Sequence, residues 1–150
     1  MLRHGEAEDT APSDFERRLT PRGERQARCA GRALKRLGVE FERVFSSPRV
    51  RALATAQIAC SKLGVAVAVH EPLGGGFEPA DALELLHALS ADGSLLLVGH
   101  EPDFSQLTTA LTGARVAVKK GGLVAIRVAG GNAELATLLR PREIELVAGD

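Results

Sequence analysis

Short apolar runs alternate with helix-like segments along the first two thirds of the chain, and this alternation limits the possible folds more than any other feature. Strand-like runs occupy residues 43–46, 65–69 and 95–98, and the last of them, Leu95-Leu96-Leu97-Val98, is continuously apolar. Such a run is typical of a parallel strand that is buried on both faces. We therefore predict an α/β fold: a three-layer sandwich with a mostly parallel central sheet and helices on both faces.

Helix boundaries are marked by residues that satisfy free backbone groups. Thr20-Pro21 and Ser47-Pro48 each place an N-cap hydroxyl before a proline at the first helical position. Gly38 and Gly64 follow the last apolar residues of these two segments, and we expect both helices to end there. Two further helices are predicted to begin at Pro79 and Pro102.

The last third of the chain changes character. Residues 123–128 and 134–139 are strand-like and flank Gly130-Gly131-Asn132, which predicts a C-terminal β-hairpin. Residues 71–77 contain three glycines in a row, but no strand leads directly into a GxGxxG or GKS pattern, so we expect an ordinary mobile loop. No repeat or long linker divides the chain, and residues 1–150 are predicted to form a single domain.

Composition excludes several classes of function. Basic and acidic residues number 19 each, so the net charge suggests neither a nucleic-acid nor a membrane partner. The absence of tryptophan and tyrosine removes the stacking platforms on which single-stranded nucleic acid binds. No membrane span or signal peptide is visible, and Cys29 and Cys60 lack a CxxC spacing. We therefore expect a cytoplasmic protein with packed, reduced cysteines.

Histidines and arginines follow the ends of the predicted strands. Arg3-His4 ends the first strand, Ser46-Ser47 ends the second with Arg51 in the helix behind it, and Gly99-His100 ends the strand at 95–98. Because the carboxyl ends of parallel strands meet at one edge of a sheet, we expect these side chains to lie together. Arginine forks match phosphate oxygens, and a neutral imidazole can attack phosphorus. The sequence therefore predicts a pocket for phosphoryl transfer.

Other interpretations of the four histidines have less support. No HxH or HxxxH pair exists, and His70 and His87 are expected to be exposed surface residues. A Ser-His-Asp hydrolase would need a GxSxG elbow, which the sequence lacks. We therefore predict that the site uses no metal ion and no other cofactor.

Four motifs, in this order along the chain, resemble those of the histidine phosphatase superfamily. They are LRHGEAE at 2–8, RRLTPRG at 17–23, SSPRVRALAT at 46–55 and VGHEP at 98–102. More narrowly, the sequence is similar to the small bacterial branch of that family, the SixA-type phosphohistidine phosphatases. Because the motifs span nearly the whole chain, they are specific together, although each one alone is weak.

The resemblance implies a role for each residue of the predicted cluster. His4 would be the nucleophile that is transiently phosphorylated on a ring nitrogen. Arg3 and Arg51 would bind phosphoryl oxygens, and His100 would complete the pocket and donate to the same oxygens. The expected fold and cluster from the strand pattern agree with this assignment.

Further residues are candidates for substrate binding. Arg17 matches another phosphate-contacting arginine of the small branch, with a solvated loop charge as the alternative. Ser47 is expected to cap a helix, with a phosphate contact as the second possibility. Glu78 is the nearest candidate for the carboxylate acid that larger relatives use, with a surface charge as an equal alternative. Arg22 and Arg49 are expected to be solvated or to face the substrate.

The start of the sequence departs from the family pattern. Only Met1 and Leu2 precede the Arg-His-Gly motif, whereas family members usually have several apolar residues there that form a central strand. We therefore expect the first strand to be truncated at the N-terminus. A missing central strand would expose its neighbours and lower stability.

The expected activity is that of a metal-independent phosphatase that works in two steps through phosphorylated His4. Its expected substrate is phosphohistidine on a signalling protein, such as a phosphotransfer domain. One alternative is a phosphatase of small phosphate esters or nucleotides, since related domains occur attached to nudix hydrolases. Another is a non-catalytic phosphate-binding module, although binding alone would not need a second reactive imidazole. A mutase is disfavoured because little chain remains to cover a retained product.

Overall fold

Six strands form one sheet in the order β3-β2-β4-β1-β5-β6 in the computed structural model, which describes residues 1–150. The strands are β1 Leu2–Arg3, β2 Arg43–Ser46, β3 Val67–Val69, β4 Leu95–Gly99, β5 Leu123–Ala129 and β6 Asn132–Leu139. Strands β1 to β4 are mutually parallel, whereas β5 runs antiparallel to both β1 and β6. The predicted parallel sheet with a C-terminal hairpin is therefore confirmed.

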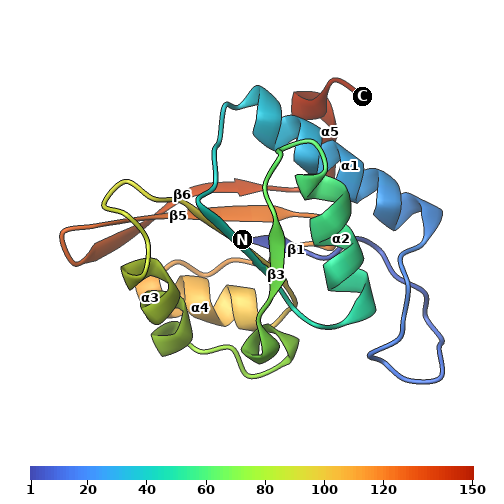
Figure 1. Cartoon of the computed structure of the whole chain (residues 1–150), viewed down its shortest axis with the longest axis horizontal. Helices are drawn as coiled ribbons and strands as arrows, with labels where there is room; N and C mark the ends of the chain where they lie inside the picture. The colour runs from blue at the N-terminus through green and yellow to red at the C-terminus, as the bar shows by residue number, and fades with distance from the viewer.

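Helices cover both faces of the sheet, as predicted. They are α1 Pro21–Arg36, α2 Val50–Cys60, α3 Pro79–His87, α4 Asp103–Thr112 and α5 Pro141–Ala148, with a short 3₁₀ helix, η1, at Glu71–Gly74. Helices α1, α2 and α5 lie on one face, and α3 and α4 lie on the other (Figure 1). No helix is both long enough and apolar enough to cross a membrane.

Side chains of β4 contribute to two separate apolar cores. Leu96 and Val98 lie in one core with Leu34 of α1, whereas Leu97 packs with Phe104 of α4 on the opposite face. Successive side chains of a strand point to opposite faces of its sheet, so a strand covered on both sides must be apolar throughout. This explains the continuous apolar run in the sequence.

The predicted cap of α1 is confirmed. The side-chain oxygen of Thr20 accepts a hydrogen bond from the N–H of Gly23 at 3.1 Å, directly before the proline that begins the helix. The helix ends at Arg36, and Gly38 follows with a φ of 66°, a conformation that glycine adopts without strain. Both ends of α1 therefore follow from local sequence.

The predicted cap of α2 is wrong. The helix begins only at Val50, so Ser47 is not its N-cap, and it ends at Cys60, before the expected stop at Gly64. The N–H of Ser47 still bonds to the carbonyl of Val98 at 2.9 Å, which keeps the chain extended past the end of β2. Ser47 therefore belongs to the sheet edge and is free to act there.

The C-terminal helix α5 was not predicted from the sequence. It begins where the N–H of Arg140 donates to the carboxylate of Glu143 at 2.7 Å, and it ends before Gly149, whose φ is 75°. Ile144 of α5 lies in the same core as Leu34 of α1, so the helix completes one face of the sheet. A proline at its first position was the available sequence signal.

The glycine-rich segment at 71–77 is more ordered than expected. Its first half is the 3₁₀ helix η1, whose Leu73 is buried in the core that also holds Phe104. Gly75 and Gly76 follow with positive φ angles of 157° and 82°. The expected mobile loop is therefore wrong for residues 71–74, because Leu73 fixes them to the core.

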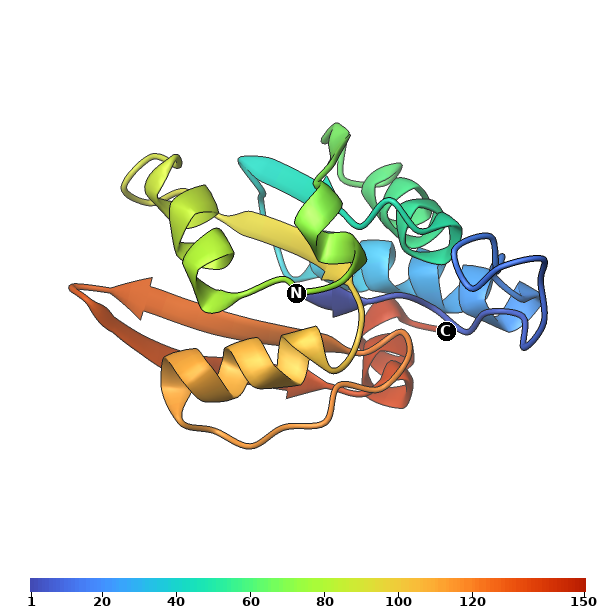
Figure 2. The ribbon, with the colours of Figure 1, turned by 90° about the horizontal axis from the view of Figure 1, so that it is seen from below.

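Strand β1 contains only two residues but lies in the middle of the sheet. Leu2 pairs with Val98 of β4 on one side and with Leu123 of β5 on the other, and it is fully buried. Figure 2 shows this short strand, in dark blue, between β4 in yellow and β5 in orange. The residue after it therefore emerges at the centre of the carboxyl edge of the sheet.

Candidate active site

The candidate site lies where three neighbouring parallel strands end. His4 follows β1, Ser47 follows β2 and His100 follows β4. The N–H of His4 bonds to the carbonyl of Gly99 at 3.0 Å, which fixes the ends of β1 and β4 side by side. The strand order thus brings together residues that are far apart in the sequence, as the carboxyl-end rule predicts.

His4, His100 and Arg51 form a buried cluster at this edge. The ring centroids of His4 and His100 lie 5.0 Å apart, with the two planes inclined by 54°. Arg51, on the first turn of α2, donates its Nε–H to Nε2 of His4 at 3.3 Å. All three side chains are buried, so water screens their charges weakly.

The proton of the His4 ring is held on the nitrogen that faces the backbone. Nδ1 lies 2.7 Å from the carbonyl oxygen of Gly5, and a carbonyl can only accept, so Nδ1 carries the hydrogen. Burial, the largest cause, and the nearby charges of Arg51 and Arg3 together lower the pKa of His4 from 6.5 to about 4. Nε2 is therefore unprotonated at neutral pH, and its lone pair, which accepts the N–H of Arg51, makes it the nucleophilic atom of the ring.

Gly5 lets the backbone pass close to α1 directly behind His4. A Cβ atom at Gly5 would lie 2.5 Å from the carbonyl oxygen of Gly23, which no side chain could tolerate. The N–H of Gly5 donates to the hydroxyl of Thr55 at 3.0 Å, and that hydroxyl donates to the carbonyl of Arg51 at 2.7 Å. This chain of contacts links the backbone at His4 to the helix that carries Arg51.

Ser47 holds the second histidine. Its hydroxyl oxygen accepts the N–H of Arg49 at 3.2 Å and lies 2.7 Å from Nε2 of His100. A hydroxyl can donate as well as accept, and we assign its hydrogen to Nε2 and the ring hydrogen of His100 to Nδ1. This Nδ1 is buried without a protein partner, and burial lowers the pKa of His100 to about 3. His100 therefore offers one unused N–H donor.

Arg3 approaches the same cluster from the other side. Its Nη1 donates to the carbonyl of Val118 at 2.8 Å, while its Nε is buried without a partner. The carboxylate of Glu101 accepts the N–H of Val118 at 3.0 Å and so fixes the segment that holds Arg3. Burial lowers the pKa of Arg3, which nevertheless remains a guanidinium cation at neutral pH.

Asp14 is the main site residue that sequence reasoning missed. Its carboxylate contacts Arg17 at 3.0 Å, Arg49 at 2.6 Å and Arg51 at 3.0 Å. Hydrogen bonds from Arg17 and then Arg51 lower the pKa of Asp14 to about 2. The carboxylate of Asp14 therefore accepts hydrogen bonds from these three arginines on the side of the exposed loop. Nothing in its local sequence distinguishes Asp14 from other acidic residues in loops.

The other arginine candidates divide between the site and the surface. Arg17 reaches the cluster through Asp14 and also donates to the carbonyl of Glu8, so it is not simply a solvated loop charge. Arg49 donates to the carbonyl of Gly74 at 2.8 Å and is likewise a member of the cluster rather than a solvated residue. Arg22 is exposed and pairs only with Glu6, at 3.4 Å.

The remaining sequence candidates lie outside this cluster. Glu78 is exposed at the start of α3, where its N–H donates to Asp81 at 2.8 Å. Its contacts are therefore those of the helix cap. His87 is exposed, as predicted. His70 is not exposed: its N–H bonds to the carbonyl of Ser46 at 2.9 Å, and its ring packs between Phe45 and Phe77 at centroid distances of 5.7 and 5.9 Å.

No group of three or more histidine, cysteine, aspartate or glutamate side chains gathers closely enough to hold a metal ion. The polar atoms at the site are instead guanidinium and imidazole nitrogens, with Asp14 as the one carboxylate in contact with them. Such a donor set suits a tetrahedral oxyanion, because each nitrogen can donate to an oxygen of the anion. The metal independence of any reaction here stays a prediction.

The chain is similar to proteins of one family. The sequence model of the histidine phosphatase superfamily (branch 1) matches residues 1–74, which include His4 and Arg51. An uncharacterised protein of Picosynechococcus sp. is 34% identical over 140 residues, which cover 85% of this chain and 82% of that protein. The structure of the protein histidine phosphatase SixA complexed with tungstate matches with a TM-score of 0.82 and 26% identity, over 94% of this chain and 95% of that chain.

A shorter similarity involves a much larger protein. The mitochondrial serine/threonine-protein phosphatase Pgam5 of Drosophila ananassae is 40% identical over 63 residues, which cover 42% of this chain but only 22% of that protein. A putative phosphohistidine phosphatase SixA from Agrobacterium tumefaciens has the same fold, with a TM-score of 0.79 at 22% identity over 93% of this chain and 95% of that chain. Fold and sequence comparisons thus agree with each other.

Proposed function

This chain belongs to the histidine phosphatase superfamily and has the fold of its SixA-type members, and we propose that it hydrolyses phosphohistidine on a protein through a phosphorylated His4. The observation that carries the proposal is the state of His4. Its Nδ1–H is bound to a carbonyl and its Nε2 is unprotonated, buried and next to Arg51. An imidazole held in this way is poised to attack phosphorus rather than to serve as a cation.

In the first step, the lone pair on Nε2 of His4 attacks phosphorus and forms a new N–P bond. The bond between phosphorus and the substrate imidazole breaks, and its electron pair stays on the leaving nitrogen. Because the other nitrogen of that ring is protonated beforehand, the leaving group departs as neutral imidazole. Arg51, Arg3 and the free Nδ1–H of His100 would hold the three phosphoryl oxygens and stabilise their charge.

In the second step, water attacks phosphorus and the bond to Nε2 breaks. The electron pair returns to Nε2, and the proton released by water goes to the inorganic phosphate product or to solvent. The carbonyl of Gly5 contributes to this step as well. It keeps Nδ1 of phosphorylated His4 protonated, so the ring leaves phosphorus as a neutral imidazole. The same hydrogen bond therefore prepares His4 both to attack and to leave.

Leaving-group chemistry favours phosphohistidine over alkyl phosphates. An alkoxide needs a proton donor in order to leave. The one candidate acid, Glu78, contacts its own helix, α3. An imidazole leaves without such help. The names of two similar proteins support a protein substrate, since one is a protein histidine phosphatase and the other a serine/threonine-protein phosphatase. The tungstate bound to the former is an oxyanion of the expected shape.

We propose that the protein acts in the cytoplasm. Both cysteines are free and buried, and burial raises the pKa of Cys60 to about 11, which keeps its thiol protonated and unreactive. Unpaired cysteines of this kind fit a reducing compartment. The partner we propose is a phosphotransfer domain or another protein that carries phosphohistidine on an accessible loop or helix.

A substrate panel tests this proposal. Values of kcat/KM are measured for a phosphohistidine-containing domain, an aryl phosphate and an alkyl phosphate, with and without EDTA. We expect the order phosphohistidine, aryl, alkyl, no effect of EDTA, and an acid-labile, alkali-stable label on the protein that His4→Ala removes. Fast turnover of the alkyl phosphate that collapses in Glu78→Gln would favour a small-ester phosphatase instead. A label that persists in His4→Ala would refute the proposed nucleophile.

A further inference from the structure

The turn that carries Lys120 lies directly against the backbone of the candidate active site. The N–H of Gly121 donates to the carbonyl of His4 at 2.9 Å and to that of Arg3 at 3.2 Å. In the other direction, the N–H of Arg3 donates to the carbonyl of Gly122 at 3.0 Å. These bonds hold Lys120 beside the residue that we propose as the nucleophile.

The turn has little freedom to move. The N–H of Gly122 donates to the carbonyl of Lys119 at 2.7 Å, which closes a β-turn around Lys120. Gly121 has a φ of 74°, as the second central residue of a type II turn requires. A Cβ atom at Gly121 would lie 2.9 Å from the side chain of Gln26 on α1, so a larger residue would force that side chain to shift. The backbone therefore fixes the position of Lys120.

The ammonium group of Lys120 acts electrostatically on the His4 ring. Burial is the main cause of the lowered pKa of His4, and the charges of Arg51, Arg3 and Lys120 lower this pKa as well. The side chain of Lys120 is half-buried, so its apolar stem is covered while its charged end stays hydrated. Because the stem is flexible, the amine can reach an anion at the mouth of the pocket.

Lys120 differs from the other two cations in having no carboxylate to offset its charge. Arg51 forms an ion pair with Asp14 at 3.0 Å. Burial lowers the pKa of Arg3, and the charge of the Glu101 carboxylate opposes that effect. Lys120 forms no ion pair with any carboxylate of the chain. The site therefore has a positive charge on the side of Arg3 that the protein does not balance.

The phosphoryl group does not require this additional charge. In the proposed reaction, one donor is assigned to each phosphoryl oxygen: Arg51, Arg3 and the Nδ1–H of His100. A fourth cation beside them suits a second anionic group of the substrate, close to the phosphoryl group. In a protein substrate, the common anionic groups are the carboxylates of aspartate and glutamate.

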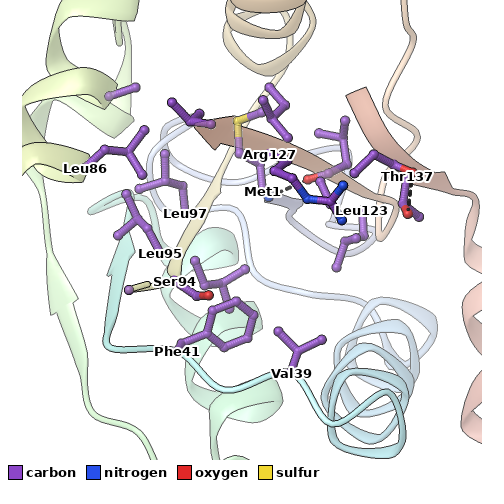
Figure 3. A pocket seen from close by; sticks show the side chains of 18 of the residues that line it. Met1, Val39, Phe41, Leu86, Ser94, Leu95, Leu97, Leu123, Arg127 and Thr137 are labelled. Carbon is purple, nitrogen blue, oxygen red and sulfur yellow. Dashed lines mark hydrogen bonds between the residues drawn. The ribbon is translucent and has the colours of Figure 1, made fainter. Parts of the chain in front are cut away.

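The large cavity of the fold offers no alternative place for a charged part of the substrate. It has a volume of about 820 Å³ and lies between β4 and β5, lined mostly by apolar side chains. Figure 3 shows Leu95 and Leu97 of β4 lining it together with Leu123 of β5. Neither histidine of the site is among its lining residues. A carboxylate would lose its hydration there without a partner.

We infer that Lys120 binds a carboxylate that lies next to the phosphoryl group of the substrate. The identity of that carboxylate rests on the proposed function, under which it is an acidic side chain beside the phosphohistidine of the protein partner. Asp14 would repel such a group on the side of Arg51, so the acidic residue approaches along the turn at 119–122. The carboxylate of a small phosphate ester has the same chemistry and is the other source to be tested.

Phosphohistidine peptides that differ only in neighbouring charge test the inference. One peptide carries glutamate on both sides of the phosphohistidine, and the other carries glutamine, which has the same size without the charge. We expect kcat/KM of the unmodified protein to be about fivefold higher for the glutamate peptide at low salt, the upper range for a half-exposed ion pair. Lys120→Met keeps an unbranched stem but removes the charge, and it should abolish the preference. Added salt should weaken the preference, because ions screen an exposed pair.

Lys119→Met is the matched control. Lys119 is the adjacent residue, but it is exposed and its charge is not among those that act on His4. The preference for the glutamate peptide should therefore persist in this variant. Lys120→Glu gives the converse test, since it should turn over a peptide with lysine on both sides of the phosphohistidine faster than the glutamate peptide.

A pair of phosphonates tests the subsite without any hydrolysis of phosphohistidine. Phosphonoacetate carries a carboxylate where ethylphosphonate carries a methyl group, and calorimetry measures the dissociation constant of each. We expect the carboxylate to tighten binding to the unmodified protein and Lys120→Met to remove the gain. A gain in this pair without a preference among the peptides would assign the carboxylate to a small phosphate ester rather than to a protein.

Three outcomes would overturn the inference. One is equal turnover of the two peptides together with equal binding of the two phosphonates. Another is a preference that Lys120→Met leaves intact, because the carboxylate would then be bound elsewhere. The third is an equal loss of turnover for both peptides in Lys120→Met, which would mean that Lys120 contacts the phosphoryl group. Failure of the proposed function differs from all three: no phosphohistidine peptide is hydrolysed, whereas the phosphonates still report whether Lys120 binds a carboxylate.

Discussion

The Nε–H of Arg51 lies 3.3 Å from Nε2 of His4, so the guanidinium donates to the very nitrogen that we propose as the nucleophile. The other two nitrogens of Arg51 donate to Asp14, at 2.5 Å to its carbonyl and 3.0 Å to its carboxylate. All five donors of arginine are rigidly placed, so these contacts fix the plane of the guanidinium against the imidazole ring. An incoming phosphoryl group would enter between the two.

Replacing Arg51 with lysine tests whether this planar contact matters. Lysine keeps the positive charge but cannot donate in two directions within one plane. We expect Arg51→Lys to lower kcat/KM about 100-fold or more, as expected for the loss of one strong transition-state contact. Steady-state kinetics with an aryl phosphate measures the effect.

Arg22→Lys provides the matched control, since Arg22 is exposed and pairs only with Glu6. Its kcat/KM should stay within a factor of about two of the unmodified protein, because exposed ion pairs contribute little. If Arg51→Lys behaves like this control, Arg51 does not touch the reacting group.

Ser47 is expected to act through His100. Loss of its hydroxyl frees Nε2 of His100, and the ring can then place its hydrogen on either nitrogen. We expect Ser47→Ala to lower kcat about tenfold with little change in KM, consistent with one buried hydrogen bond of roughly 1.4 kcal/mol. Ser47→Thr keeps the hydroxyl and should restore most of the rate.

The tautomer of His100 distinguishes a positioning role of Ser47 from general damage to the fold. Nitrogen-15 NMR of the imidazole should report Nδ1–H in the unmodified protein and in Ser47→Thr, and a mixture of tautomers in Ser47→Ala. A lower rate with an unchanged tautomer would show that Ser47 serves only the fold of the strand end.

Sequence patterns predicted the strands, the cap of α1 and the convergence of His4, Arg51 and His100. The convergence was predictable because strand direction alone decides which ends meet, whatever the side chains do. Ser47 was misplaced because its N–H stays in the sheet ladder, which a local capping rule cannot foresee. Asp14 could not be found, since two of its partners, Arg49 and Arg51, lie far along the chain at the start of α2.

Acid should destabilise the fold through its buried histidines. The pKa of His4 is lowered to about 4 and that of His100 to about 3, mainly by burial, against 6.5 in the unfolded chain. Below pH 6.5 the unfolded chain binds protons that the folded protein excludes, so stability falls as pH decreases. The loss should accumulate between pH 6.5 and about 4, at up to about 1.4 kcal/mol per unit for each histidine.

Urea unfolding at pH 7.5, 6.5, 5.5 and 4.5 measures this dependence. The Met1 amine, whose pKa is lowered to about 5, adds a similar loss that begins near pH 8. His4→Asn removes one titrating group and should flatten the curve below pH 6.5 while leaving the part above it unchanged. A curve with the same slope in both proteins would mean that His4 is not buried in its neutral form.

Asp14 is expected to compete with the phosphoryl group for the arginines. Its carboxylate already accepts from Arg17, Arg49 and Arg51, and a dianion entering the pocket would meet a like charge there. Asp14→Asn removes that charge, so we expect vanadate and inorganic phosphate to inhibit about fivefold more tightly, the effect of roughly 1 kcal/mol from a partly screened charge. Asp9→Asn, an exposed acid in the same loop, is the matched control and should leave inhibition unchanged. Weaker inhibition in Asp14→Asn would instead mean that the carboxylate holds Arg51 in place for the anion rather than opposing it.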